Sequence, residues 1–122
     1  MVHVSPERFE ELVANALDSI PAELAAAVEN VAIEVAEWPT EAQLDGRGGT
    51  LLGLYEGVPL TERGPMSYAG VMPDHITVFR GPLCAIARTE DELAQQVRVT
   101  VLHEVGHYFG MDDDHLRELG WA

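Results

Sequence analysis

The segment from residue 89 to residue 110, TEDELAQQVRVTVLHEVGHYFG, limits the fold of this chain more than any other part of it. Thr89 starts a capping box and Gly110 is typical of a helix end, so the segment predicts one long helix. A helix that is apolar on nearly all sides is buried. Other elements should therefore pack around this one, whose apolar residues near His103 are Val97, Val99, Val101, Leu102, Val105, Tyr108 and Phe109.

Further helices are expected at both ends of the chain. Ser5 fits an N-cap and Pro6 the first helical position, and the apolar spacing that follows predicts a helix that ends before Pro21. Residues 22–30 predict a short second helix. Residues 112–122 predict one or two helical turns, with acidic residues in the first turn, where the helix dipole favours them.

Three strands are expected between the N-terminal helices and the long helix. Residues 31–36 alternate with period two, residues 51–57 are prone to β structure after a glycine-rich connection at 39–50, and Ile76 to Arg80 predict a third strand. Residues 58–74 have three prolines, two glycines and no periodicity. A loop of that length in a compact domain is usually functional or flexible, so it is a candidate wall of a site.

The composition restricts the kinds of partner. The 21 acidic residues face only 7 basic ones, all arginine, and the net charge of -14 repels nucleic-acid phosphates. No apolar run approaches the roughly 18 residues that span a bilayer, and the N-terminus lacks a signal-peptide pattern. The single cysteine, Cys84, is expected to be a small buried residue in a reducing compartment. We expect one cytoplasmic domain, residues 1–122, with no membrane or nucleic-acid partner.

Two histidines four residues apart point to a metal. His103 and His107 lie on one face of the expected helix, at a separation suited to chelating one tetrahedral ion, and Glu104 lies beside them. Burying these groups without partners would cost several kcal/mol each. An isolated histidine is more often a core residue bonded to a backbone carbonyl, but the set of three favours a metal site.

A third ligand is expected after Gly110, because two histidines alone do not hold zinc. The motif continues as HExxHxxGxxD, and its spacing favours Asp113. From the residues alone, Asp112, Asp114 and His115 remain alternatives, since the register of a short turn is not fixed by sequence. One aspartate is expected to cap the last helix while another binds the metal.

The run HEVGHYFGMDD resembles the extended zincin signature, in which a glycine lets the chain reverse and return a third ligand to the metal. LLGLYEGVPLTERG, the spacing of Tyr68 and Gly70, and PDHITVFRGPL look like the minimal zincin-like metallopeptidase family of small bacterial proteins. The resemblance covers about residues 5–121. It implies an α+β minimal zincin fold, with a small mixed sheet packed against helices and the HExxH helix beneath the cleft.

That resemblance also implies roles for the motif residues. His103, His107 and Asp113 would bind Zn²⁺, and Glu104 would be the catalytic base. His75 departs from the family, which more often has arginine there, and we expect an ordinary histidine where a loop meets a strand.

Three other metal arrangements fit the chain less well. A gluzincin needs a glutamate from a later helix, and only Glu118 remains before Ala122. A metzincin has a methionine turn after its third ligand, whereas Met111 precedes Asp113 and is expected to pack. Cys84 lacks the glycine and glutamine motifs of a deformylase site.

The sequence therefore predicts a zinc-dependent metallopeptidase whose substrate is a peptide or protein. With three protein ligands, zinc keeps a position for water, whose proton Glu104 would accept before the attack on a peptide carbonyl. The substrate would add as a strand to an exposed sheet edge. Tyr68 is expected to be an ordinary exposed or packed loop tyrosine, and an oxyanion donor is the alternative interpretation.

The alternative prediction is a non-catalytic module. In it the zinc site stabilises the fold, His115 or Asp114 supplies a fourth protein ligand, and the acidic surface engages an unknown protein partner.

Overall fold

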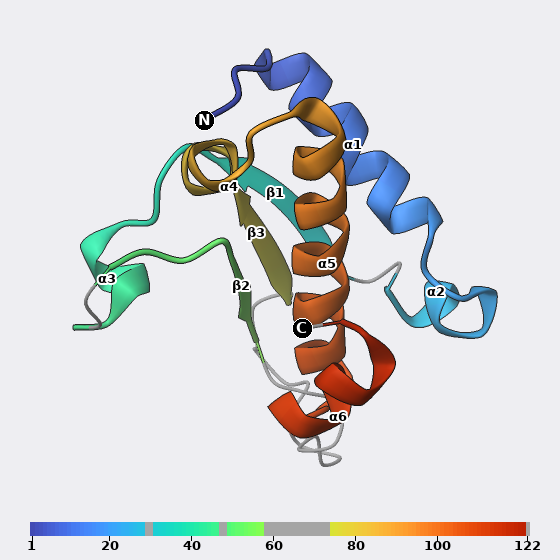
Figure 1. Ribbon diagram of the computed structural model, residues 1–122. Helices are drawn as coiled ribbons and strands as arrows, with labels where there is room; N and C mark the ends of the chain where they lie inside the picture. The colour runs from blue at the N-terminus through green and yellow to red at the C-terminus, as the bar shows by residue number, and fades with distance from the viewer. Residues whose placement is uncertain (29–30, 47–48, 58–73, 122) are drawn as a thin grey trace.

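The protein has an α+β fold in which a small mixed sheet packs against helices, as predicted. In the computed structural model, residues 1–28, 31–46, 49–57 and 74–121 are described (Figure 1). The elements, in chain order, are α1 (Pro6–Asp18), α2 (Ala22–Val28), β1 (Ala32–Ala36), α3 (Glu41–Leu44), β2 (Gly53–Glu56), β3 (His75–Phe79), α4 (Arg80–Ile86), α5 (Glu90–Tyr108) and α6 (Asp113–Leu119).

The sheet has the order β1-β3-β2. β1 runs parallel to β3, and Ala32 is opposite His75. β2 runs antiparallel to β3, and Glu56 is opposite the same histidine. Among the described residues, β1 and β2 are therefore the two edges, and β3, whose last four residues are buried, is the centre.

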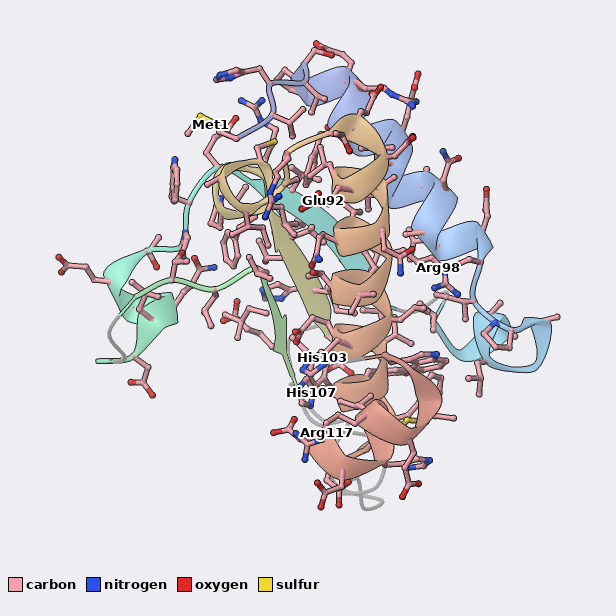
Figure 2. All side chains as sticks on the ribbon, viewed as in Figure 1. Met1, Glu92, Arg98, His103, His107 and Arg117 are labelled. Atoms are coloured by element: carbon pink, nitrogen blue, oxygen red, sulfur yellow. The ribbon has the colours of Figure 1, made fainter. Side chains whose placement is uncertain are left out.

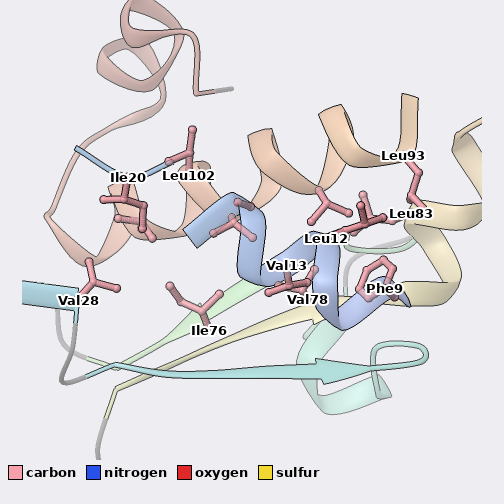
Figure 3. Close-up of a cluster of buried hydrophobic side chains, with 14 of the residues drawn as sticks. Phe9, Leu12, Val13, Ile20, Val28, Ile76, Val78, Leu83, Leu93 and Leu102 are labelled. Carbon is pink, nitrogen blue, oxygen red and sulfur yellow. The ribbon is translucent and has the colours of Figure 1, made fainter. Parts of the chain in front are cut away.

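Helix α5 is the element around which the others pack, as its sequence predicts. It contacts α1, α4, β2 and β3, and Val97, Val101 and Val105 are fully buried. Figure 3 shows side chains of α1, β3, α4 and α5 meeting in one cluster, with Phe9, Ile76, Leu83 and Leu93 among them. No helix among the described residues is long and apolar enough to cross a membrane.

The predicted helix ends are confirmed. The Ser5 hydroxyl accepts a hydrogen bond from the Arg8 N–H, and the Thr89 side chain accepts one from the Glu92 N–H. Gly110 follows α5 with a φ of 79°, in the left-handed region that glycine adopts without strain. Its N–H donates to His107 O, and Met111 N–H donates to Gly106 O, which is the Schellman pattern.

The glycine-rich connection at residues 39–50 contains an unpredicted one-turn helix, α3. Thr40 and Gln43 form a complete capping box at its start. Each side chain binds the other's backbone N–H, and this local exchange holds a turn that has no buried residue.

The third strand ends at Phe79, one residue earlier than predicted, and Arg80 begins helix α4. Gly81 and Pro82 suggest a break in structure, but a proline in the first turn of a helix loses no hydrogen bond, because its N–H would be unpaired there. Pro82, Leu83 and Cys84 are the buried residues of α4, so Cys84 is the small buried residue that was expected.

Candidate metal centre

Three polar side chains gather on the C-terminal half of α5. His103, Glu104 and His107 each offer a ligand atom, and these atoms lie within 4.8 Å of one another. Figure 2 shows both imidazoles on the side of α5 that faces β2. The sequence predicted this grouping from helical spacing alone.

The two imidazoles converge on one point. His103 Nε2 and His107 Nε2 are 3.0 Å apart, and the ring planes are inclined at 82°. Two nitrogens on one tetrahedral zinc, each at about 2.0–2.1 Å, lie roughly 3.3 Å from each other. The side chains therefore fit the group that the motif implies, with an adjustment of a few tenths of an ångström.

The other nitrogen of His103 has a partner of its own. Nδ1 lies 3.1 Å from the backbone oxygen of Trp121, which follows α6. A carbonyl oxygen only accepts, so Nδ1 carries the hydrogen, and Nε2 of the neutral ring keeps its lone pair. No sequence motif could predict this contact, because it joins a side chain to a backbone group 18 residues away.

Glu104 is the buried acid of the group. Only 8 % of the residue is exposed, and Oε1 accepts a hydrogen bond from the Tyr55 N–H at 3.0 Å. Burial raises the pKa of the carboxyl above its usual value, whereas His107, His103 and the Tyr55 N–H lower it and Asp113 raises it further. Burial dominates, so the environment increases the affinity of this carboxylate for a proton.

Strand β2 comes unusually close to α5 at Gly53. A Cβ there would lie 2.7 Å from Thr100 Cγ2 and 3.3 Å from Glu104 Cγ. Only glycine lets the backbone approach the helix to this distance. The same approach brings the Tyr55 N–H to Glu104, and neither residue was identified from the sequence.

The outer edge of β2 faces the group formed by His103, Glu104 and His107. Leu52 O accepts from Phe79 N–H, so alternate residues of β2 bond to β3, and the backbone groups of Gly53 and Tyr55 point the other way. One of those groups, the Tyr55 N–H, already donates to Glu104. This edge therefore borders the site that the two histidines form.

A cleft of about 490 Å³ lies between the start of β2 and α5. His103 and Glu104 are at its edge, and its other walls are uncharged. The remaining lining residues are Thr50, Leu51, Leu52, Gly53, Gln95, Gln96, Val99 and Thr100.

The three aspartates after Met111 have different surroundings. Asp112 is the N-cap of α6, where its Oδ1 accepts from the His115 N–H at 2.8 Å, and Asp114 pairs with Arg117. Asp113 is the first residue of α6, and its charge acts on Glu104. It is not within the 4.8 Å group, so its role as third ligand stays a prediction.

The other histidine and loop residues considered from the sequence are elsewhere. His75 begins β3, and its Nε2 is 3.1 Å from Glu56 Oε1, which confirms its place where a loop meets a strand. Tyr68, and the predicted site wall apart from the buried Asp74, lie outside the described residues. His115, a competing ligand, is exposed.

Comparison with known proteins identifies the family and the fold of the chain. The profile of the zincin-like metallopeptidase family matches residues 28–121. No protein with a curated description matches the chain. A solved structure, a conserved hypothetical protein from Thermus thermophilus, is 24 % identical, with a TM-score of 0.56 over 95 % of this chain and 97 % of that one. This likeness shows a shared fold.

Proposed function

The chain belongs to the zincin-like metallopeptidase family, and on that premise we propose that it is a zinc-dependent metallopeptidase that hydrolyses peptide bonds. The observation that carries the proposal is the approach of two Nε2 atoms to 3.0 Å, with a buried carboxylate beside them. In this proposal His103 and His107 bind the metal and Glu104 is the general base.

Asp113 is the third ligand in this proposal. Two neighbouring aspartates already have partners, since Asp112 caps α6 and Asp114 pairs with Arg117. The effect of Asp113 on the pKa of Glu104 supports a position near the centre. Two imidazoles and one carboxylate form a donor set that suits zinc and leaves one position open.

Zinc bound there would supply a Lewis acid that polarises a carbonyl oxygen and acidifies water. Glu104 would take the proton from the attacking water and pass it to the leaving amine. The Tyr55 N–H holds Oε1, so we assign the proton transfer to Oε2. A raised carboxyl pKa suits this role, because it brings the base closer to the pH at which it must both accept and release a proton.

The substrate is proposed to be a peptide in extended form. It would lie along the outer edge of β2, where Gly53 presents backbone groups, and would occupy the adjoining cleft beside Glu104. The uncharged walls favour apolar or uncharged polar side chains at that position.

The test is a comparison of Glu104→Gln with the wild type. We expect the variant to keep one bound zinc and to lose hydrolysis of a mixed peptide library by about 10²- to 10⁴-fold, the usual contribution of a general base. Glu34→Gln, an exposed position on the opposite edge strand β1, is the matched control and should keep full activity. Zinc binding without hydrolysis by the wild type would refute the peptidase and favour the zinc-stabilised interaction module.

A further inference from the structure

We propose that the turn after α6 is part of the metal site, and that the Trp121 carbonyl is a positioning group for His103. The inference rests on the proposed zinc site and extends it to a backbone group that touches neither the metal nor the substrate. It follows from the 3.1 Å contact between His103 Nδ1 and Trp121 O and from how the chain makes that contact.

The contact determines which tautomer of His103 is present. The neutral imidazole carries one hydrogen, and a carbonyl acceptor at Nδ1 places it there. Nε2, the atom that lies 3.0 Å from His107 Nε2, is then in the form that binds a metal. Without the carbonyl the ring is free to take the other tautomer, which must lose a proton from Nε2 before it can bind zinc.

Gly120 directs the Trp121 carbonyl to His103. It has a φ of 77°, its N–H donates to Arg117 O at 3.1 Å, and Trp121 N–H donates to Leu116 O at 2.8 Å. This is a second Schellman turn, equivalent to the one at Gly110. It reverses the chain after α6 and returns it to α5 (Figure 1).

Helix α6 is also fixed against α5 next to the ligands. Leu116 is fully buried, and a Cβ on Gly106 would overlap its Cδ2 atom. Gly106 lies inside the HExxH motif, three positions after His103, so Leu116 of α6 packs next to the proposed ligands. Asp113 is the first residue of α6, and Trp121 follows the end of this helix. The same helix therefore positions both the proposed third ligand and the carbonyl that contacts His103.

The position of Gly120 allows a matched pair of variants. Nothing lies within 4 Å of a Cβ built there, so a side chain has room and only the backbone conformation matters. Asparagine tolerates the left-handed region, whereas β-branched valine does not. Gly120→Asn should keep the turn, and Gly120→Val should open it and move the Trp121 carbonyl. A third variant, Trp121→Ala, keeps the carbonyl and removes the indole.

Two measurements test the proposal. The first is the ring ¹⁵N NMR spectrum of His103 in metal-free protein at a pH where the ring is neutral. We expect the Nδ1–H form in the wild type, Gly120→Asn and Trp121→Ala, and a mixture in Gly120→Val. The second is zinc affinity, which we expect to fall about 10- to 100-fold in Gly120→Val, the usual effect of losing an outer partner, and less than about threefold in Gly120→Asn.

The proposal is overturned if the wild-type His103 ring is in the Nε2–H form, or if Gly120→Val binds zinc as tightly as the wild type. It is also overturned if neither the wild type nor any variant binds zinc. Equal losses in Gly120→Val and Trp121→Ala would also overturn it, because they would assign the effect to packing of the indole. A wild type that binds zinc but hydrolyses no peptide leaves this inference standing and refutes the peptidase.

Discussion

The three aspartates that follow α5, Asp112 to Asp114, have different roles. Asp112 does not bind the metal in our proposal. Its carboxylate accepts a hydrogen bond from the His115 N–H and so caps the start of α6. Asp114 is turned to Arg117. The sequence left Asp112, Asp113, Asp114 and His115 as candidate ligands, since each is within reach of a turn of unknown register. The bonds made by Asp112 and Asp114 leave Asp113 and His115 as candidates, and the motif spacing is the reason for proposing Asp113.

Alanine substitution of each aspartate should separate these roles. Asp113→Ala should lower zinc affinity by more than about 100-fold, because loss of a ligand exceeds the 10- to 100-fold effect of losing an outer partner. Asp112→Ala should cost about 1 kcal/mol of unfolding free energy through the lost cap. Asp114→Ala should change little, since an exposed ion pair contributes at most about 1 kcal/mol. Competition for zinc with a chromogenic chelator, together with urea denaturation, gives both quantities. Asp112→Ala as the weakest zinc binder would contradict the assignment.

Gly106 is the second residue with a testable role. Alanine in a helix interior normally adds about 1 kcal/mol of stability relative to glycine. Here its methyl group would overlap the buried Leu116, and overpacking costs about 1–3 kcal/mol, so we expect Gly106→Ala to be destabilising. The double variant with Leu116→Ala should show a coupling of at least about 0.5 kcal/mol in a double-mutant cycle. Additive effects on urea denaturation would show that the two residues do not meet.

At the scale of elements, local sequence patterns correctly predicted the helix caps and the strand that depend on local interactions. Ser5 and Thr89 cap the helices that they were expected to cap, and the alternation at residues 31–36 became β1. Helix α4 was missed because the signals Gly81 and Pro82 also mark a turn, and its burial against α5 and β1 is a tertiary effect. The approach of β2 to α5 at Gly53 was likewise invisible, since a glycine in a strand does not indicate which element lies next to it.

That approach can be tested at Gly53. Gly53→Ala places a methyl group 2.7 Å from Thr100 Cγ2, so we expect a loss of about 1–3 kcal/mol in unfolding free energy as β2 is pushed from α5. Thr100→Ser removes the opposing methyl group and keeps the hydroxyl. Adding it to Gly53→Ala should restore part of the loss, which urea denaturation of all four proteins would measure. A fully additive pair would indicate that β2 does not approach α5 at this point.

At the scale of the whole molecule, the sequence predicted the part of the site that lies on α5. His103, Glu104 and His107 share α5, so helical spacing was enough to group them. The Tyr55 N–H and the Trp121 carbonyl reach the same centre through β2 and the turn at Gly120, and such contacts depend on packing between distant segments. Backbone groups are also shared by nearly all residue types, so no sequence motif can identify which of them contact the site.

In our proposal the zinc site joins α5 and α6, so zinc should stabilise the entire fold. Free zinc at 100 times its dissociation constant would add about 2.7 kcal/mol to the unfolding free energy. A net charge of -14 complicates this expectation, because any cation screens the self-repulsion of the chain. Magnesium separates the two effects: it has the same charge as zinc but prefers oxygen ligands to imidazole. We expect zinc, and not equimolar magnesium, to raise the melting temperature, and we expect His103→Ala to abolish the difference in differential scanning calorimetry. Equal shifts with both ions would mean that the acidic surface, rather than a built site, responds to the metal.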